Sequence, residues 1–599
     1  MGRQKEKGKQ KGIGTPSFWN DKSSIALAIF AVAVSAIAMF PSLENGFTNW
    51  DDDLYVIENQ MVKEFKSEHI IQPVSGNFHP LTMLSLSWDY TNGEGKPGSF
   101  HRTNFVLHLA NVFLVFWLLW LLSGKSRIAA FTGSLLFGIH PMHVESVAWI
   151  SERKDVLYSV FFLSGLIAYR HHQKSKKWIH LLATFAFFFL SLLSKPAAIC
   201  FPFVLLLFHF YPGFQIRRSD LYRLIPFAIV SLCWAFLTWD AQSESGSTAT
   251  AEFDFFRQMA IGGFAAAYYV IQFFAPVSLS PYHPLPMGEL PAYYFPAGVL
   301  FLLLLVLIIL FRKKFPVIFF GFFFFLITIA LVLQFIPVGH AAVAERYTYI
   351  PYIGLSIPVA AFASFVAADP RFAKIRQWFA ALGILIACIF AYVSMERCKV
   401  WKDSNTLWTA VLKSYPDDAF AYGKRGQFLA VSGKTEEAAA DYTRALQRDP
   451  GMADVWHNLG EIWMEKGMKG KALEHFDKAI ALRPDYAAAW NNRGNVFFRD
   501  QRWTEAVENY GSAILADPSF IKAFINRGNA NLRLKNFDAA LADLGRAIAL
   551  DPEFAQAYFV RAFVFRDMGE SKRYQEDLLK AQSLGYQVPR EMMKDQVER

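Results

Sequence analysis

Apolar and polar stretches alternate along the first two thirds of this chain in a pattern typical of membrane-spanning helices. Several apolar stretches are only just long enough to cross a bilayer, which needs roughly 17 to 25 helical residues. The pattern predicts an all-α, polytopic membrane domain over residues 24–396, with about eleven transmembrane helices. The apolar stretches lie near residues 24–41, 102–122, 128–142, 155–169, 178–194, 197–211, 224–239, 258–275, 296–311, 315–336, 347–367 and 377–395.

One stretch, residues 258–275, is expected not to cross. Short loops rich in Lys and Arg stay on the cytoplasmic side of a membrane. With the N-terminus inside, residues 312–314 obey this rule only if residues 240–295 remain at the outer surface. Residues 1–23 then form a basic cytoplasmic tail rather than a removed signal, and everything after about residue 396 is exported. The other basic residues of the predicted cytoplasmic loops are Lys125, Arg127, Arg170, Lys174, Lys176, Lys177, Arg217, Arg218, Arg223, Arg371, Lys374 and Arg376.

The exported part repeats itself with the period of tetratricopeptide repeats, about 34 residues. Small residues let two helices cross closely, and proline ends the second helix of each pair. Residues 419–588 are predicted to form five repeats of an α-solenoid, between a connector (397–418) and a C-terminal tail (589–599). The concave face of the solenoid would bind an extended peptide or a partner protein; a rigid spacer is the alternative. The repeated positions are Pro416, Pro450, Pro484, Pro518 and Pro552, and Gly426, Gly460, Gly494 and Gly528, with Ala562 completing the second series.

Composition agrees with a membrane protein rather than a soluble enzyme, since 53% of the residues are apolar and 16% are aromatic. The net charge of +9 falls mostly on the predicted cytoplasmic side, where it favours membrane lipids with anionic headgroups. This charge does not indicate nucleic-acid binding. The four cysteines show no paired spacing, so neither a disulfide framework nor a zinc site is implied.

A polar, acidic loop, residues 42–101, interrupts the apolar pattern directly after the first stretch. It contains the run Asn-Trp-Asp-Asp-Asp at residues 49–53. Three successive Asp residues cannot lie in hydrocarbon, and beside a membrane they indicate a metal, a helix N-terminus or proton transfer. The run is therefore either a solvated helix cap or a catalytic carboxylate site.

Further polar residues are predicted on the same, outer face of the membrane. Polar residues at membrane depth are costly and usually functional, and here they come from five loops. If the chain is helical after Pro141, then Glu145, Trp149 and Glu152 share one helix face. The candidate residues for binding a substrate or a lipid phosphate are His79, His140, His143, Glu145, Glu152, Arg153, Lys154, Lys195, Glu345 and Arg346.

Simpler explanations exist for each of these residues. His140 and His143 could be satisfied by water, or they could hold a metal, although the sequence fixes no third ligand. The cations could extend to lipid headgroups. Glu345 and Arg346 could form a local ion pair at a helix end.

The order of the polar motifs resembles that of a known family. The motifs are Asn-Trp-Asp-Asp (49–52), His-Pro-Leu-Thr (79–82), His-Pro-Met-His-Val-Glu-Ser-Val-Ala-Trp (140–149), Ser-Glu-Arg-Lys-Asp (151–155), Ser-Lys-Pro (194–196) and Glu-Arg-Tyr (345–347). Followed by tetratricopeptide repeats, this series is similar to bacterial relatives of the transmembrane and TPR-repeat O-mannosyltransferases (the TMTC family). The resemblance covers nearly the whole chain.

The resemblance implies a GT-C fold and an inverting glycosyltransferase in a bacterial inner membrane, working at the periplasmic face with a polyprenyl-phosphate sugar as donor. It implies that Asp51 or Asp52 is the general base, while Asp53 has no assigned role. Cations such as Arg153, Lys154, Lys195 or Arg346 would stabilise the leaving phosphate. The repeats would recruit the acceptor, a protein Ser or Thr or else a glycan. No cofactor is certain, and a divalent cation is possible.

Two other classes of function stay open at the sequence level. A non-catalytic scaffold for envelope assembly would tolerate substitutions in the Asp and His-Pro loops. A transporter of lipid-linked sugars would need charged residues deep within its spans, and the sequence has few. An O-antigen-ligase-like transferase is the competing enzyme.

Overall fold

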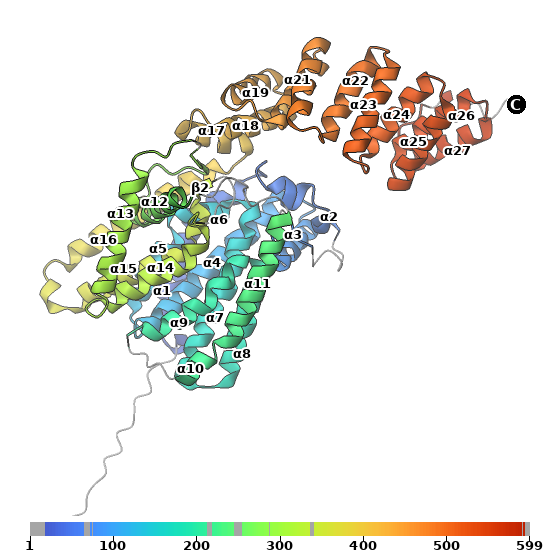
Figure 1. Ribbon diagram of the computed structural model, residues 1–599. Helices are drawn as coiled ribbons and strands as arrows, with labels where there is room; N and C mark the ends of the chain where they lie inside the picture. Colours follow the sequence, from blue (N-terminus) through green and yellow to red (C-terminus); the bar gives the residue numbers. More distant parts are fainter. Residues whose placement is uncertain are drawn as a thin grey trace, which may run out of the picture. The chain divides into compact units, whose positions relative to one another are not determined.

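The computed structural model describes residues 18–64, 72–74, 76–212, 218–244, 254–286, 288–335, 341–589 and 591–592. Most of the predicted N-terminal tail, Arg217 and most of the predicted C-terminal tail lie outside these residues. The chain divides into two compact units, Met1–Ser414 and Tyr415–Arg599 (Figure 1).

The first unit is a bundle of helices that follows the apolar pattern. Its helices are α1 (Lys22–Met39), α2 (Gln60–Lys63), α3 (Pro80–Asn92), α4 (Pro97–Leu122), α5 (Arg127–Gly138), α6 (Val144–Ala148), α7 (Arg153–Ser175), α8 (Trp178–Ser194), α9 (Phe201–Leu207), α10 (Arg218–Tyr222), α11 (Ile225–Glu244), α12 (Phe255–Phe274), α13 (Tyr294–Leu310), α14 (Pro316–Ile329), α15 (Pro351–Ala368), α16 (Arg376–Val400) and α17 (Ser404–Ser414).

Among the described residues of this unit, five segments are long and apolar enough to cross a membrane: Lys22–Glu44, Pro97–Leu122, Asp220–Ala241, Pro351–Ala368 and Arg376–Val400. Shorter apolar helices lie at Arg127–Gly138, Trp178–Ser194, Pro196–Phe210, Tyr294–Leu310 and Pro316–Val332. The all-α class and the membrane character are therefore confirmed. The count of eleven spans and their orientation stay predictions.

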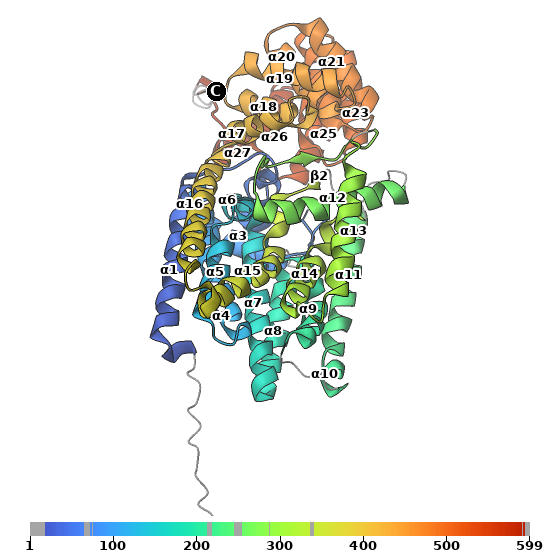
Figure 2. The same cartoon turned by 90° about the vertical axis from the view of Figure 1, so that its left-hand side faces the viewer.

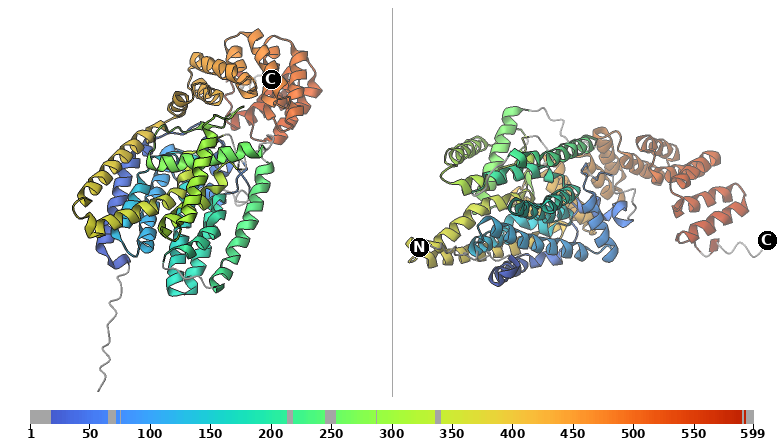
Figure 3. Two further views of the ribbon diagram at one scale, coloured as in Figure 1. Left: turned by 60° about the vertical axis from the view of Figure 1, so that its left-hand side comes forward. Right: turned by 90° about the horizontal axis from the view of Figure 1, so that it is seen from below.

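Helix α12, which covers the stretch predicted not to cross, differs in direction from its neighbours. It lies across the bundle, near the end that carries α6 (Figure 2), and a second view shows the same crossing (Figure 3). Its Tyr269 and Phe273 belong to a buried cluster with Phe325 of α14 and Tyr352 of α15. That this stretch does not cross the membrane stays a prediction, like the number of spans.

A two-stranded antiparallel sheet closes the same end of the bundle. Strand β1 (His283–Pro284) pairs with β2 (Ala341–Val343), with His283 opposite Val343. The sheet fixes the chain immediately before Glu345. It thereby brings the segment after α14 to the loops that follow α1 and α5.

The second unit contains five helix pairs at the predicted spacing. The pairs are α18 (Ala419–Val431) with α19 (Thr435–Arg448), α20 (Ala453–Glu465) with α21 (Lys469–Leu482), α22 (Ala487–Arg499) with α23 (Trp503–Ala516), α24 (Ile521–Arg533) with α25 (Phe537–Leu550), and α26 (Ala555–Asp567) with α27 (Ser571–Ser583).

Each of the first three repeats closes around a glycine of its first helix. A Cβ atom added at Gly494 would lie 2.7 Å from the ring of Tyr510 in the second helix, and one at Gly426 would lie 2.7 Å from Tyr442. Only glycine leaves room for the large side chain there. The periodic glycine series thus marks the tightest contact of these repeats.

Candidate functional site

Asp52, in the acidic run, is fully buried. Its Oδ2 accepts hydrogen bonds from the backbone N–H (2.8 Å) and hydroxyl (3.1 Å) of Thr48. Its Oδ1 accepts from the backbone N–H (3.1 Å) and hydroxyl (2.5 Å) of Ser151. Burial raises the pKa of Asp52 to about 6, although these hydrogen bonds act to lower it. Asp52 therefore clamps the first loop to the turn at Ser151.

Asp51, in contrast, is only half-buried and lies near a basic residue. Burial raises the pKa of the neighbouring Tyr55, while the charge of Lys154 acts to lower it and that of Asp51 to raise it. Lys154 Nζ lies 4.8 Å from the centre of the Tyr55 ring. Of the predicted pair, Asp51 is thus the partly exposed residue and Asp52 the buried one.

His79 begins α3 beside the same group of residues. It is buried and stacks on Tyr55, with 5.4 Å between ring centroids. Burial, helped by the charge of Lys154, lowers the pKa of His79 to about 3, so the imidazole is neutral. Neither ring nitrogen has a hydrogen-bond partner among the described residues. Such a buried polar group requires an explanation, and a bound ligand would supply a partner.

The segment after Pro141 is not one continuous helix, so the predicted shared helix face of Glu145, Trp149 and Glu152 is wrong. Helix α6 ends before Trp149, whose backbone is extended, and the short helix η6 (Ile150–Glu152) follows. Asn104 of α4 stabilises the break, because its amide donates to the carbonyl of Trp149 (3.0 Å).

Glu152 is instead surrounded by three cations from three separate segments. Its Oε1 lies 3.3 Å from Lys154 Nζ and 3.3 Å from Arg346 Nε, and its Oε2 lies 3.8 Å from Lys195 Nζ. Burial acts to raise the pKa of Glu152, but the three cations lower it to about 2. Glu152 is therefore ionised, and we call Lys154, Lys195 and Arg346 the cation cluster.

The cations and carboxylates of this network differ in exposure. The side chains of Lys154, Lys195 and Arg346 are 14%, 17% and 15% exposed, whereas that of Glu152 is 1% exposed. The other carboxylates are equally covered: Glu145 pairs with Arg346 (2.5 Å) and Asp155 pairs with Lys195. Buried carboxylates thus hold partly exposed cations in place, an arrangement that can bind an anion.

Glu345 and Arg346 do not form the local ion pair considered as an alternative. The two side chains point to different partners, since Arg346 pairs with Glu145 and Glu345 pairs with Arg397 of α16 (2.7 Å). Burial raises the pKa of Glu345 to about 8 despite this partner. The two neighbouring residues therefore connect η10 (Glu345–Thr348) to two distant segments.

Arg153 lies deeper than the cation cluster. It is fully buried, and its guanidinium pairs with Asp89 (2.5 Å) and donates to Asn104, the Ser85 hydroxyl (2.6 Å) and the Phe100 carbonyl (2.9 Å). These bonds join α3, α4 and α7. Arg153 has the contacts of a structural cross-link rather than of a residue that meets a substrate.

His140 and His143 are both buried and face the protein backbone. His140 Nε2 lies 3.1 Å from the Phe273 carbonyl, and His143 Nδ1 lies 2.8 Å from the Phe137 carbonyl. Among the described residues, no three His, Cys, Asp or Glu side chains gather in a way that could hold a metal ion.

Aromatic side chains pack against Arg346 of the cation cluster. Trp50, directly before Asp51, stacks on Trp149 (4.8 Å between centroids) and contacts Trp408 of α17 (5.3 Å). The Arg346 guanidinium lies 5.7 Å from the Trp50 ring and 5.5 Å from the Trp149 ring. Cation–π contacts of this kind stabilise a charged group where water is scarce. They keep Arg346 beside the acidic run.

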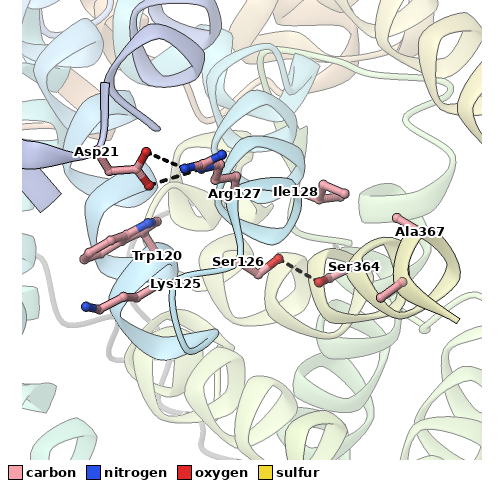
Figure 4. A pocket seen from close by; sticks show the side chains of 9 residues that line it. Asp21, Trp120, Lys125, Ser126, Arg127, Ile128, Ser364 and Ala367 are labelled. Atoms are coloured by element: carbon pink, nitrogen blue, oxygen red, sulfur yellow. Dashed lines mark hydrogen bonds and ion pairs between the residues drawn. The ribbon is translucent and has the colours of Figure 1, made fainter. Parts of the chain in front are cut away.

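A pocket of about 490 Å³ lies at the other end of the bundle. The pocket is bordered by the start of α1, the start of α5, the end of α4 and the end of α15. The cation cluster lies at the opposite end of the bundle. Arg127 pairs there with Asp21 (2.7 Å), and the hydroxyls of Ser126 and Ser364 are 2.6 Å apart (Figure 4). This pocket is separate from the candidate site.

Sequence reasoning missed several residues of the site. Asp89, Asp155 and Arg397 pair with predicted site residues, and Trp401 and Trp408 pack around the acidic run. Asp89 lies in the predicted outer loop 42–101 and Asp155 ends the motif at residues 151–155, so their charge was a usable signal. Arg397, in the last turn of α16, carried the same signal.

Comparison with protein families identifies the repeats. Three tetratricopeptide repeat models match residues 401–453, 431–494 and 521–554. Among solved structures, a TPR protein titled YrrB matches with 21% identity and a TM-score of 0.26, covering 30% of this chain and 92% of that structure. MamA matches with 21% identity and a TM-score of 0.25 over 26% of this chain and 93% of that structure.

Curated relatives extend the similarity beyond the repeats. Protein O-mannosyl-transferase Tmtc1 of Drosophila melanogaster is 33% identical over 124 residues, which are 21% of this chain and 14% of that protein. TMTC3 of Mus musculus is 33% identical over 23% of this chain and 16% of its own length. Protein O-mannosyl-transferase F38B6.6 of Caenorhabditis elegans is 23% identical over 74% of this chain and 64% of that protein.

The fold and the repeats define the chain as an all-α, polytopic membrane protein with a tetratricopeptide domain. Its relatives make it a TMTC-like protein, which confirms the resemblance seen in the motifs. The chain spans less than two thirds of the length of each of these relatives.

Proposed function

We propose that this chain is a membrane glycosyltransferase that moves a sugar from a polyprenyl-phosphate donor to an acceptor hydroxyl. The observation that carries the proposal is the cation cluster, in which Lys154, Lys195 and Arg346 are partly exposed above a buried Glu152. The relatives named as protein O-mannosyl-transferases support the same reaction class.

The cation cluster would hold the donor phosphate. When the bond between the sugar and the phosphate oxygen breaks, negative charge grows on that oxygen. Fixed cations stabilise such charge without reorganising during the reaction. His79, whose ring nitrogens lack partners among the described residues, would donate one further hydrogen bond to the phosphate.

Asp51 would act as the general base. It takes the proton of the acceptor hydroxyl while the hydroxyl oxygen attacks the anomeric carbon, and polyprenyl phosphate leaves from the opposite side. A single displacement of this kind inverts the anomeric centre. The half-buried position of Asp51 beside Lys154 supports this role, while the four hydrogen bonds to the buried Asp52 suit a residue that positions the loop.

The reaction would occur at the outer, periplasmic face, and the tetratricopeptide array would recruit the acceptor. Solenoids of this class form extended concave binding surfaces. Such a surface favours a protein Ser or Thr as the acceptor. A glycan acceptor would use the array to recruit an assembly partner instead. A divalent cation is compatible with this scheme, because Glu145, Glu152 and Asp155 already pair with the three cations of the cluster.

The test is a transfer assay with the full-length protein in lipid nanodiscs. Labelled polyprenyl-phosphate mannose and glucose are supplied with acceptor peptides and with membrane glycans. Asp51→Asn should lower kcat about 10²- to 10⁴-fold, which is the usual contribution of general base catalysis. Asp53→Asn is the matched control and should keep wild-type transfer. Full transfer by Asp51→Asn would overturn the assignment of the base.

A second pair of variants tests the phosphate site. Lys154→Ala and Lys195→Ala should raise the KM for the lipid donor and lower kcat, because each removes a charge that faces the phosphate. If the wild type transfers no sugar from any donor but still binds a partner through its repeats, a scaffold replaces the enzyme as the function.

A further inference from the structure

Helix α17 continues the period of the repeats toward the N-terminus. The second helices of the first four repeats end at evenly spaced residues, and the end of α17 stands one step before them: Ser414, then Arg448, Leu482, Ala516 and Leu550. Pro416 follows α17 as Pro450 follows α19. By position, α17 is therefore the second helix of an additional repeat, and a tetratricopeptide model begins its match at residue 401.

Within the described residues, the helix one period before α18 is α16, and it does not pack along α17 as α18 packs along α19. In the first complete repeats, the glycine of the first helix contacts an aromatic residue of the second, as Gly426 contacts Tyr442. The residue of α17 equivalent to Tyr442 is Trp408. The position equivalent to Gly426 is Tyr392, in the apolar helix α16. The Tyr392 residue is 65% exposed. Trp408 is nevertheless fully buried, so another segment covers it.

The loop that carries the acidic run covers Trp408 in place of such a helix. Trp50 packs on Trp408 (5.3 Å between centroids). The Trp408 indole N–H donates to the Asn49 side-chain oxygen (2.8 Å), and the Asn49 backbone N–H donates to the Ser404 hydroxyl (2.9 Å). Both bonds are made by a residue only two positions before Asp51.

The backbone before Asn49 is held in the same way. The Gly46 N–H donates to the Lys402 carbonyl (2.8 Å), and the Asn45 amide donates to the Cys398 carbonyl (3.0 Å). A Cβ atom at Gly46 would lie 3.3 Å from the Lys402 oxygen, which is a close approach. Four hydrogen bonds thus fasten residues 45–49 to the chain between the last turn of α16 and the middle of α17.

We infer that α17 is a half repeat whose Ser404 and Trp408 are positioning residues for Asp51. This inference rests on the proposed function, because it assigns these two residues to the placement of the general base. They touch neither sugar nor phosphate, and they act by holding the loop that presents the Asp51 carboxylate. Helix α17, which leads into the repeat array, therefore also borders the candidate site.

The first experiment measures loop mobility and needs no transferase activity. Amide hydrogen exchange is followed in full-length protein for the peptide spanning residues 45–52. Ser404→Ala combined with Trp408→Phe should speed exchange at the Gly46 and Asn49 amides about tenfold or more, since two hydrogen bonds are lost. Trp456→Phe is the matched control, because it removes an indole N–H that donates within the repeats, to Pro450 (2.9 Å). Unchanged exchange in the double variant would overturn the inference.

The second experiment measures transfer by the same variants. The double variant should lower kcat about tenfold while the KM for the lipid donor changes little, because the cation cluster is intact. Ser404→Thr, which keeps the hydroxyl, should restore kcat relative to Ser404→Ala. Faster exchange with unchanged kcat would overturn the positioning role. If the wild type transfers no sugar, the proposed function fails, and the exchange experiment still decides whether α17 holds the loop.

Discussion

Arginine–carboxylate pairs stabilise both units of the chain, but they do so over different distances in sequence. In the repeats, Arg527 pairs with Asp543 (2.6 Å), 16 residues away, and the same spacing recurs in other repeats. In the helical unit, Arg346 pairs with Glu145, 201 residues away. The repeat pairs each join two helices of one repeat, whereas the pairs of the helical unit bring remote loops together.

The difference shows what each unit uses its charges for. The arginines of these repeat pairs are 18% to 27% exposed, against 14% to 17% for the cation cluster, and their aspartates are 3% to 9% exposed. In the helical unit, the carboxylates behind the cation cluster are at most 2% exposed. Burying charges costs free energy unless geometry and hydrogen bonds are good. The cost in the helical unit is explained if the cations must stay fixed for a ligand.

The largest effect should come from removing the guanidinium of Arg346. Arg346→Ala leaves Glu145 and Glu152 buried with fewer partners, which should destabilise the protein by about 3–5 kcal/mol and lower transfer at least ~10²-fold. Arg527→Ala, the matched change in the repeats, should cost about 1 kcal/mol or less. Thermal unfolding in detergent and the transfer assay measure both. Equal losses for the two variants would contradict the comparison.

A smaller loss is expected at the clamp formed by Asp52. In Asp52→Asn, the amide nitrogen must face a backbone N–H of Thr48 or Ser151, so a buried donor loses its acceptor at a cost of about 1–3 kcal/mol. Glu58→Gln, an exposed carboxylate in the same loop, should change stability by less than ~0.5 kcal/mol. Differential scanning fluorimetry compares the two. A stable Asp52→Asn protein would show that the clamp is dispensable.

The repeats can be tested by a change that involves no charge. Gly494→Ala places a methyl group 2.7 Å from Tyr510, and such overpacking should cost about 1–3 kcal/mol. At Gly470 nothing lies within 4 Å of an added Cβ atom, so Gly470→Ala should be neutral or stabilise α21 by up to ~1 kcal/mol. Denaturant unfolding of the full chain, followed by circular dichroism, tells them apart. A neutral Gly494→Ala would contradict the tight helix contact.

A separate effect, confined to one pH range, concerns Glu345. Its pKa is about 8 in the folded protein, against an ordinary value of 4.5. Between these values the folded state retains a proton that the unfolded chain has released, so this group makes the free energy of unfolding fall as pH rises from about 4.5 to about 8. The wild type should therefore lose a few degrees of Tm relative to Glu345→Gln over that range. Parallel pH profiles would contradict the raised pKa.

Much of the fold could be predicted from local patterns. The repeats followed from a strict period, because each helix pair makes its tightest contact within a single repeat, as at Gly494 and Tyr510. The helices of the first unit followed from apolar length. The break at Trp149 could not be predicted, since it depends on a hydrogen bond from Asn104, which lies on another helix.

The candidate site was predictable in membership more than in geometry. Charge and membrane side selected Glu152, Lys154, Lys195 and Arg346 as a group, and the structure brings these four together. The partner of each charge was not predictable, because ion pairs between remote loops depend on how the helices pack. For the same reason, the sequence could not distinguish the half-buried Asp51 from the buried Asp52.

The strict spacing of the helix pairs has a consequence for how such a chain can change over generations. Each repeat of a solenoid contacts only its neighbours. The helix that contacts the acidic loop is α17, which belongs to the other unit. Duplication or loss of one whole repeat, such as residues 487–520, would join a glycine-bearing helix to the same kind of neighbour as before. The array can therefore lengthen or shorten, and so acquire new partners, without disturbing the residues around Asp51.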